Sequence, residues 1–240
     1  GTVAAEGVAA AAAGQVAAQL QAAGVEPGDR VAGYMPNRIE TVIAALGCAW
    51  IGAIWSSCSP DFGVEGVLDR FGQIEPKVLF ACDGYQYNGK WIELDERIQA
   101  LHAELQPELL IVIPGRGDTS AVRQALNWRD WLAAAGAPPA FAELPFDHPL
   151  YILYSSGTTG APKCIVHGTG GALIQHAKEH RLHGDLGADD VLFYFTTCGW
   201  MMWNWLVSGL QTGATLVLYD GNPAYPDATR LFDVIDAEKI

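Results

Sequence analysis

Apolar residues recur at helical spacing near the start of the chain. Val8, Ala12, Val16 and Leu20 lie four residues apart, which predicts an amphipathic helix. Short apolar runs bounded by Gly, Pro or polar residues then alternate with further helical patterns. Strands are expected at residues 30–35, 53–57, 77–82, 108–113, 150–155, 163–167, 191–196 and 214–219. This alternation predicts an α/β fold with mainly parallel sheets flanked by helices.

Two features of the chain suggest where elements and lobes begin. Asn37 is expected to cap the helix that follows it, with Glu40 as the reciprocal partner of a capping box. The Pro-rich stretch 136–149 lacks periodicity and is interpreted as a linker between a first α/β lobe, 1–135, and a second lobe, 150–240. Because the last helical pattern runs to the final residue without a stop signal, we expect the second lobe to be incomplete at its C-terminal end.

Composition excludes several classes of protein. Half of the residues are hydrophobic and 17% are charged, which is typical of a packed globular protein. The net charge of −13 argues against nucleic acid as a partner, because such binding neutralises phosphates with Lys and Arg. The five cysteines are scattered without a C-x-x-C, which favours a reducing cytoplasm. Gly, Ser, Thr and Asn interrupt the longest uncharged runs, so we expect no membrane span.

The sharpest chemical feature is the loop YSSGTTGAPK at residues 154–163, which lies between two apolar strands. Its small residues let backbone N–H groups approach an anion, its hydroxyls add donors, and Lys163 adds a positive charge. The spacing does not match the Walker pattern, and a strand rather than a helix is expected after Lys163, which disfavours a P-loop kinase. A hydroxyl-rich turn without a ligand remains the alternative.

The extended stretch YSSGTTGAPKCIVHG resembles the signature loop of the adenylate-forming family, which includes acyl-CoA synthetases, luciferases and peptide-synthetase adenylation domains. Segments 28–37, 48–53 and 76–79 also resemble that family. The resemblance implies that the loop binds the phosphates of ATP, and that Mg²⁺ lies near Thr158 or Thr159. By the same resemblance, the phosphate-binding residues are Ser155, Ser156, Gly157, Thr158, Thr159, Gly160 and Lys163.

Within the family, segments 56–80, 82–90 and 195–210 are most similar to acetoacetyl-CoA synthetases. The resemblance implies a ligase that converts acetoacetate, ATP and coenzyme A to acetoacetyl-CoA, AMP and diphosphate through an acyl-adenylate. The family's catalytic Lys belongs to a later segment, so this chain alone is expected to be inactive. The alternatives are another short-chain acyl-CoA synthetase, for acetate or propionate, and a non-catalytic nucleotide-binding module of the same fold.

Two further groups of side chains are candidates for binding a ligand, one for the acid and one for a metal ion. Residues 200–204 follow a strand end, where ligands commonly bind in open α/β sheets. The expected acid pocket comprises Trp200, Met201, Trp203 and Asn204, with the Asn204 amide donating to the β-keto oxygen; helix-core packing is the alternative for these aromatic residues. His176, His180 and His183 share a predicted helix face, which suits either a metal site or ordinary packing.

Overall fold

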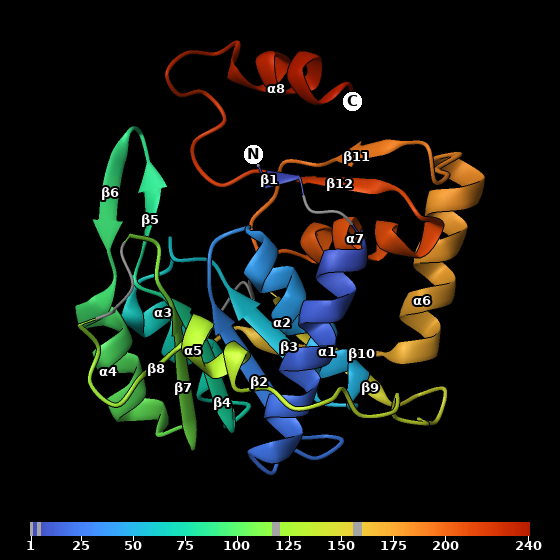
Figure 1. Ribbon diagram of the computed structural model, residues 1–240. Helices are drawn as coiled ribbons and strands as arrows, with labels where there is room; N and C mark the ends of the chain where they lie inside the picture. The colour runs from blue at the N-terminus through green and yellow to red at the C-terminus, as the bar shows by residue number, and fades with distance from the viewer. Residues whose placement is uncertain (1, 4–5, 117–120, 156–159) are drawn as a thin grey trace.

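The computed structural model describes residues 2–3, 6–116, 121–155 and 160–240 (Figure 1). Seven of the described strands form one sheet in the order β10-β9-β3-β2-β4-β7-β8. All neighbours in this sheet are parallel except β10, which runs antiparallel to β9 at one edge. The strands are β2 (Arg30–Tyr34), β3 (Ile54–Cys58), β4 (Val78–Cys82), β7 (Leu109–Ile113), β8 (Leu126–Asn127), β9 (Pro149–Ser155) and β10 (Lys163–Gly168).

Helices cover both faces of this sheet, because successive strand residues point to opposite sides. In β4, Val78 and Phe80 pack with α1 (Glu6–Ala22), α2 (Ile39–Trp50) and α5 (Trp128–Ala133). Leu79 and Ala81 pack instead with α3 (Val64–Phe71) and α4 (Asp95–Leu105). Two hydrophobic cores therefore lie on the two faces of one sheet, which confirms the predicted α/β fold with a mostly parallel sheet.

A smaller sheet of three described strands follows the order β1-β12-β11. Its strands are β1 (Thr2–Val3), β11 (Val191–Phe193) and β12 (Thr215–Leu218), with β11 and β12 parallel. The accompanying helical elements are α6 (Thr169–Lys178), a π-helical turn η1 (Glu179–His183), α7 (Met201–Ser208), a 3₁₀ turn η2 (Gly209–Thr212) and α8 (Arg230–Glu238). In Figure 1, α6 stands beside this sheet and α8 lies above it.

The hairpin of β5 (Gly84–Tyr87) and β6 (Lys90–Glu93) projects from the main sheet (Figure 1). Its two-residue turn consists of Asn88 at φ +50° and Gly89 at φ +70°. Two positive φ angles define the turn type that matches the twist of a two-stranded ribbon, and Asn-Gly is its preferred sequence. The composition of residues 85–90 therefore serves a hairpin.

The start of α2 differs from the capping box expected from the sequence. Arg38 occupies the N-cap position, and no side chain caps the helix there. The side chain of Asn37 is buried and bonds to distant segments, while Glu40 forms an ion pair with Arg38. The predicted cap is wrong because tertiary partners of the Asn37 amide replace the local backbone N–H groups.

The Pro-rich segment 136–149 packs on the outer side of α1 and α2. The Trp50 indole N–H donates to the Pro139 carbonyl oxygen at 2.9 Å, and the Trp50 ring stacks on Phe141 with a centroid distance of 4.0 Å. A hydrogen bond of 2.8 Å also joins His148 Nε2 to the Gly52 carbonyl oxygen. The seven-stranded sheet includes strands from both sides of this segment.

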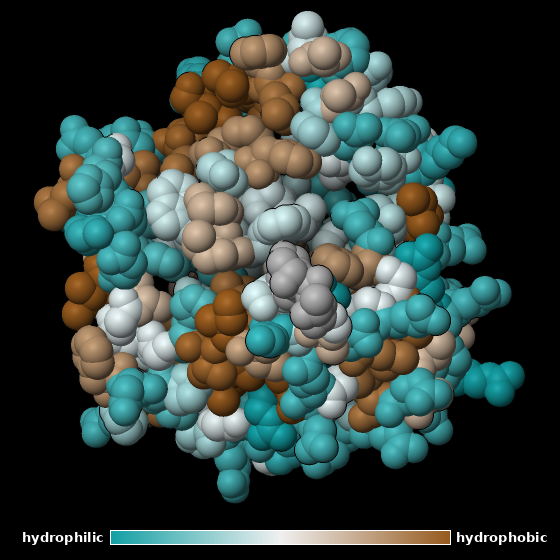
Figure 2. All heavy atoms as spheres, turned by 180° about the vertical axis from the view of Figure 1, so that it is seen from behind, coloured by the Kyte–Doolittle hydropathy of each residue, from teal (hydrophilic) through white to brown (hydrophobic). Residues whose placement is uncertain are grey.

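The molecular surface carries separate apolar patches among polar side chains on the face seen from behind (Figure 2). Exposed large apolar residues include Ile165 and Val166 on the edge strand β10 and Leu173 and Ile174 on α6. Among the helices of the described ranges, none combines the length and apolar character that crossing a bilayer requires.

Candidate functional site

The hairpin of β9 and β10 fixes both ends of the hydroxyl-rich loop. Ser155 and Lys163 are directly paired in its antiparallel ladder, so the loop leaves and re-enters the sheet at one place. Lys163 is exposed and Ser155 is half-buried. Gly160 has a φ of +99°, a conformation that a residue with a Cβ rarely adopts. The other expected phosphate-binding residues, Ser156, Gly157, Thr158 and Thr159, lie outside the described residues.

Gln73, which follows α3, holds the C-terminal side of this loop. Its side-chain amide donates to the Pro162 carbonyl oxygen at 2.7 Å, and its amide oxygen lies 3.6 Å from the Cys164 sulfur. On the N-terminal side, the Ser56 hydroxyl lies 3.0 Å from the Tyr154 hydroxyl oxygen. Sequence reasoning missed Gln73, because nothing in the local pattern shows that residues 89 positions apart meet.

A polar hollow of about 260 Å³ lies where several strands end, and we call it the strand-end recess. Its lining includes Asn37, Asp61, Tyr85, Thr196, Tyr219 and Asp220. Asp220 stays accessible to solvent, yet desolvation by the surrounding protein raises the pKa of its carboxyl to about 6, against the opposing effect of Arg38. Desolvation also raises the pKa of Tyr85 to about 12.

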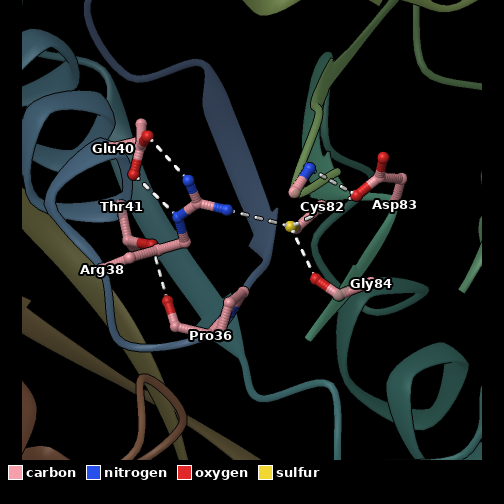
Figure 3. A network of polar contacts seen from close by, with 8 residues as sticks. Pro36, Arg38, Glu40, Thr41, Cys82, Asp83 and Gly84 are labelled. Atoms are coloured by element: carbon pink, nitrogen blue, oxygen red, sulfur yellow. Dashed lines mark hydrogen bonds and ion pairs between the residues drawn. The ribbon is translucent and has the colours of Figure 1, made fainter. Parts of the chain in front are cut away.

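Beside the recess, Arg38 connects the carboxyl ends of β2 and β4 (Figure 3). Its guanidinium donates two hydrogen bonds of 2.8 Å to Glu40, and its Nη1 lies 3.4 Å from the Cys82 sulfur. The Cys82 thiol donates to the Gly84 carbonyl oxygen at 2.9 Å. Although Arg38 lowers the pKa of this thiol, burial has the larger effect and raises it to about 11, which keeps the sulfur protonated at neutral pH.

The neighbouring Asp83 carboxylate accepts a hydrogen bond of 2.6 Å from the Gly115 backbone N–H. This contact joins the end of β4 to the segment after β7.

Sequence reasoning also missed Arg38. The available signal was the scarcity of basic residues, 14 against 27 acidic ones, which makes each arginine worth attention.

The four residues expected to form an acid pocket lie at the N-cap and in the first turn of α7. Trp200 and Met201 are 66% and 48% exposed, whereas Trp203 and Asn204 are 1% and 7% exposed. The Trp203 indole N–H donates to the Asn37 side-chain oxygen at 2.9 Å. Asn204 lines a mainly apolar cavity of about 200 Å³, and its Nδ2 has no hydrogen-bond acceptor within the described part of the chain. The exposed pair and the buried pair therefore meet different surroundings.

The two buried histidines, His176 and His180, pack between α6, η1 and α7. Hydrogen bonds of 2.9 and 3.0 Å join His180 Nε2 to the Trp205 carbonyl oxygen and the Ser208 hydroxyl. Burial lowers the pKa of both imidazoles, which favours their neutral forms. His183 is exposed. Within the described ranges, no group of three His, Cys, Asp or Glu side chains is arranged to hold a metal ion.

The fold and the loop sequence together define a class: an α/β domain in which a hydroxyl-rich loop is closed at its base by the pairing of Ser155 with an exposed lysine, Lys163. The family model described as "AMP-binding enzyme" matches residues 8–240, and the chain belongs to this family. This membership agrees with the resemblance read from the loop sequence.

Individual members of the family are similar to this chain over most of its length. The acetoacetyl-coenzyme A synthetase of Rhizobium meliloti (strain 1021) is 56% identical over 225 residues, which are 92% of this chain and 34% of the relative. The malonamoyl-CoA synthetase of Penicillium aethiopicum is 43% identical over 86% of this chain and 30% of the relative.

Among solved structures, the acetoacetyl-CoA synthetase from Streptomyces lividans matches with a TM-score of 0.90 and 48% identity. The match covers 95% of this chain and 36% of that structure. The chain thus spans about a third of the length of the relatives it matches.

Proposed function

We propose that the complete gene product containing this chain is an acetoacetate–CoA ligase of the AMP-forming type. The observation that carries this proposal is the 56% identity to an acetoacetyl-coenzyme A synthetase across 92% of the chain. The chain supplies part of the ATP site and part of the acid site. Because it spans about a third of its relatives, the proposal concerns the complete protein, and the isolated chain is expected not to complete turnover.

The proposed reaction has two steps. In the first, an oxygen of the acetoacetate carboxylate attacks the α-phosphorus of ATP, and diphosphate leaves to give acetoacetyl-AMP. In the second, the thiolate of coenzyme A attacks the acyl carbonyl carbon and AMP leaves. Adenylation replaces a poor leaving group with a good one, and positioning and charge stabilisation supply most of the catalysis at phosphorus.

In this proposal, the residues of the loop bind the leaving diphosphate. Ser155 and Lys163 are paired at the base of the loop, so the backbone from which the Lys163 side chain extends is held in the sheet. A positive charge aimed at oxygens that gain charge stabilises the transition state more than the ground state. Mg²⁺, when bound, would neutralise part of the phosphate charge. Thr158 and Thr159 lie outside the described residues.

For the acid, we propose that the cavity lined by Trp203 and Asn204 receives the acyl group, with Trp200 and Met201 outside it at the exposed start of α7, and that the Asn204 amide recognises the β-keto oxygen. The support is the Asn204 Nδ2 group, which is buried without an acceptor in the described structure. A buried donor without a partner destabilises a protein, and a ligand carbonyl would satisfy it. The malonamoyl-CoA synthetase relative is consistent with this chemistry, because malonamate carries a carbonyl at the same position as acetoacetate.

The test is AMP release by the complete gene product with ATP, Mg²⁺ and coenzyme A. Acetoacetate, malonamate, acetate, propionate, butyrate and 3-hydroxybutyrate would be compared by kcat/KM. We expect acetoacetate to lead, with butyrate far behind because it lacks the β-carbonyl. Equal use of butyrate would overturn the proposed recognition of that carbonyl. No AMP release with any acid would favour a non-catalytic nucleotide-binding module.

We also place the protein in the cytoplasm. The five cysteines are all free thiols, which suits a reducing compartment. Localisation of a fluorescent fusion in a cell that produces the protein tests this placement.

A further inference from the structure

The side chain of Asn37 connects segments that are far apart in the sequence. It directly follows the β2 region and is 4% exposed. Its oxygen accepts from Trp203 Nε1 at 2.9 Å, and its Nδ2 lies 3.4 Å from the carbonyl oxygens of both Thr196 and Tyr219. A single amide therefore joins the carboxyl end of the seven-stranded sheet to the loops that follow β11 and β12 in the small sheet.

Two of these contacts lie at the ends of the segment that carries Trp200, Met201 and Trp203, and Asn204 follows it directly. Asn37 holds Thr196 at one end of the segment 196–203 and Trp203 at the other. Within the segment, Trp200 N donates to the Thr197 carbonyl oxygen at 3.2 Å, and Trp203 N donates to the Trp200 carbonyl oxygen at 3.1 Å. The backbone from Thr196 therefore passes through a bonded turn into the first turn of α7, and one side chain bonds to both ends of this segment.

The hydrogen bond between Trp203 and Asn37 connects two residues that line different cavities. Asn37 lines the strand-end recess of about 260 Å³, and Trp203 lines the mainly apolar cavity of about 200 Å³ that also contains Asn204. Trp203 is 1% exposed, so its indole is enclosed by protein. The bond from Trp203 Nε1 to Asn37 Oδ1 keeps the ring in that place.

We infer that Asn37 is a positioning residue for the acid substrate: it fixes the Trp203 ring and the turn that carries Trp200 and Met201. This inference rests on the proposed function. An amide is suited to the role because it offers an acceptor to the indole N–H and donors to the two carbonyl oxygens at once. A leucine of similar shape offers neither, so the ring and the turn lose their common support.

The experiment uses the complete gene product and compares Asn37→Leu, Trp203→Phe and the double variant with the wild type. AMP release gives KM and kcat for acetoacetate, butyrate and hexanoate, and KM for ATP. We expect Asn37→Leu to raise KM for acetoacetate about tenfold, the equivalent of losing one buried hydrogen bond to the site, while KM for ATP changes less than about twofold. Its preference for acetoacetate over hexanoate should fall as well.

The double variant tests whether Asn37 acts through Trp203. Trp203→Phe removes the indole donor but keeps an aromatic ring. It therefore tests the same hydrogen bond from the other side if Asn37→Leu does not fold. If the two residues act as one unit, the double variant should be little worse for acetoacetate than Asn37→Leu alone. Asn127→Ala is the matched control, because Asn127 is also a structural amide and caps α5 through the Arg129 N–H at 2.8 Å.

Two outcomes separate the inference from the function on which it rests. In the first, the wild-type enzyme prefers acetoacetate, but Asn37→Leu and Asn127→Ala lower the Tm alike and leave KM for acetoacetate unchanged. This result would overturn the positioning role alone. A wild-type protein that releases no AMP with any acid would overturn the proposed function itself.

Discussion

The Ser57 hydroxyl donates a hydrogen bond of 2.7 Å to the carbonyl oxygen of Cys198, 141 positions away along the chain. Ser57 lies in β3 near the centre of the seven-stranded sheet, and Cys198 lies in the loop that leads to Trp200. The same hydroxyl accepts from Trp55 Nε1 at 3.2 Å. The bond fixes the start of this loop against the sheet, and both of its residues are buried.

Replacing Ser57 with alanine tests the value of this contact. Ser57→Ala leaves the Cys198 carbonyl and the Trp55 indole N–H buried without their partner, which costs about 1–3 kcal/mol. We expect the free energy of unfolding in urea to fall by that amount. Ser59→Ala is the control, because the Ser59 hydroxyl makes a local bond to Asp61 at 2.8 Å. Equal losses in the two variants would contradict a special role for the long-range bond.

His180 gives the fold a dependence on pH. Its imidazole is 1% exposed, and burial lowers its pKa from the ordinary value of 6.5. The unfolded chain therefore binds a proton more readily, so stability is fully present above pH 6.5 and is lost as the pH falls through the lower folded value. We expect the free energy of unfolding to decrease below about pH 6.5, by up to about 1.4 kcal/mol per pH unit for one such group.

His180→Gln checks the source of this slope, because glutamine does not ionise and can still donate to the Trp205 carbonyl oxygen. Chemical denaturation between pH 5 and 8, a range of about three units around the ordinary histidine value, should give a shallower slope in this variant. His183→Gln, an exposed position in the same π-helical turn, should leave the slope near the wild-type value. The opposite ranking would show that another group carries the effect.

Trp50 attaches the Pro-rich segment 136–149 to α2. In Trp50→Leu, both the hydrogen bond to Pro139 and the stack on Phe141 are lost. We expect a protease to cleave within 136–149 several times faster, since aromatic pairs contribute about 0.5–1.5 kcal/mol and a neutral hydrogen bond about 1 kcal/mol. Trp50→Phe keeps a ring and should fall between the wild type and leucine. Unchanged cleavage in Trp50→Leu would show that other contacts hold the segment.

Lys163→Met separates the function of the loop from the fold. Because Lys163 is exposed on the edge strand, we expect the Tm to change by less than about 2 °C, as for an ordinary surface substitution. AMP formation by the complete gene product should fall about 10²–10³-fold, the usual effect of losing one group that stabilises transition-state charge. A variant with wild-type turnover would remove Lys163 from the proposed phosphate site.

Much of the fold could be predicted because period-two and helical patterns are local. The pattern over 77–82 predicted a strand, and in the resulting β4 alternate residues enter the two cores. The pairing of strands was not visible. For example, nothing in the local sequence shows that β3 pairs with β9, because the paired residues Trp55 and Tyr151 lie far apart along the chain.

The site was predictable only where chemistry is concentrated in one segment. The loop 154–163 was found by its composition, whereas Gln73 reaches it from a helix end and left no local signal. Asn37 was misread for the same reason. Its sequence position satisfies the capping pattern, yet its amide has partners 159 to 182 positions away, and those partners appear only after the chain folds.

The placement of β9 between β3 and β10 sets an order of events during synthesis. Trp55 in β3 pairs with Tyr151 in β9, so one edge of β3 has no partner strand until residues about 96 positions later leave the ribosome. At about 5–20 residues per second, that wait lasts about 5–20 seconds. During it, the growing chain presents an unpaired apolar strand to its surroundings, the feature that invites wrong pairing. Chaperone contact is expected to concentrate in that interval.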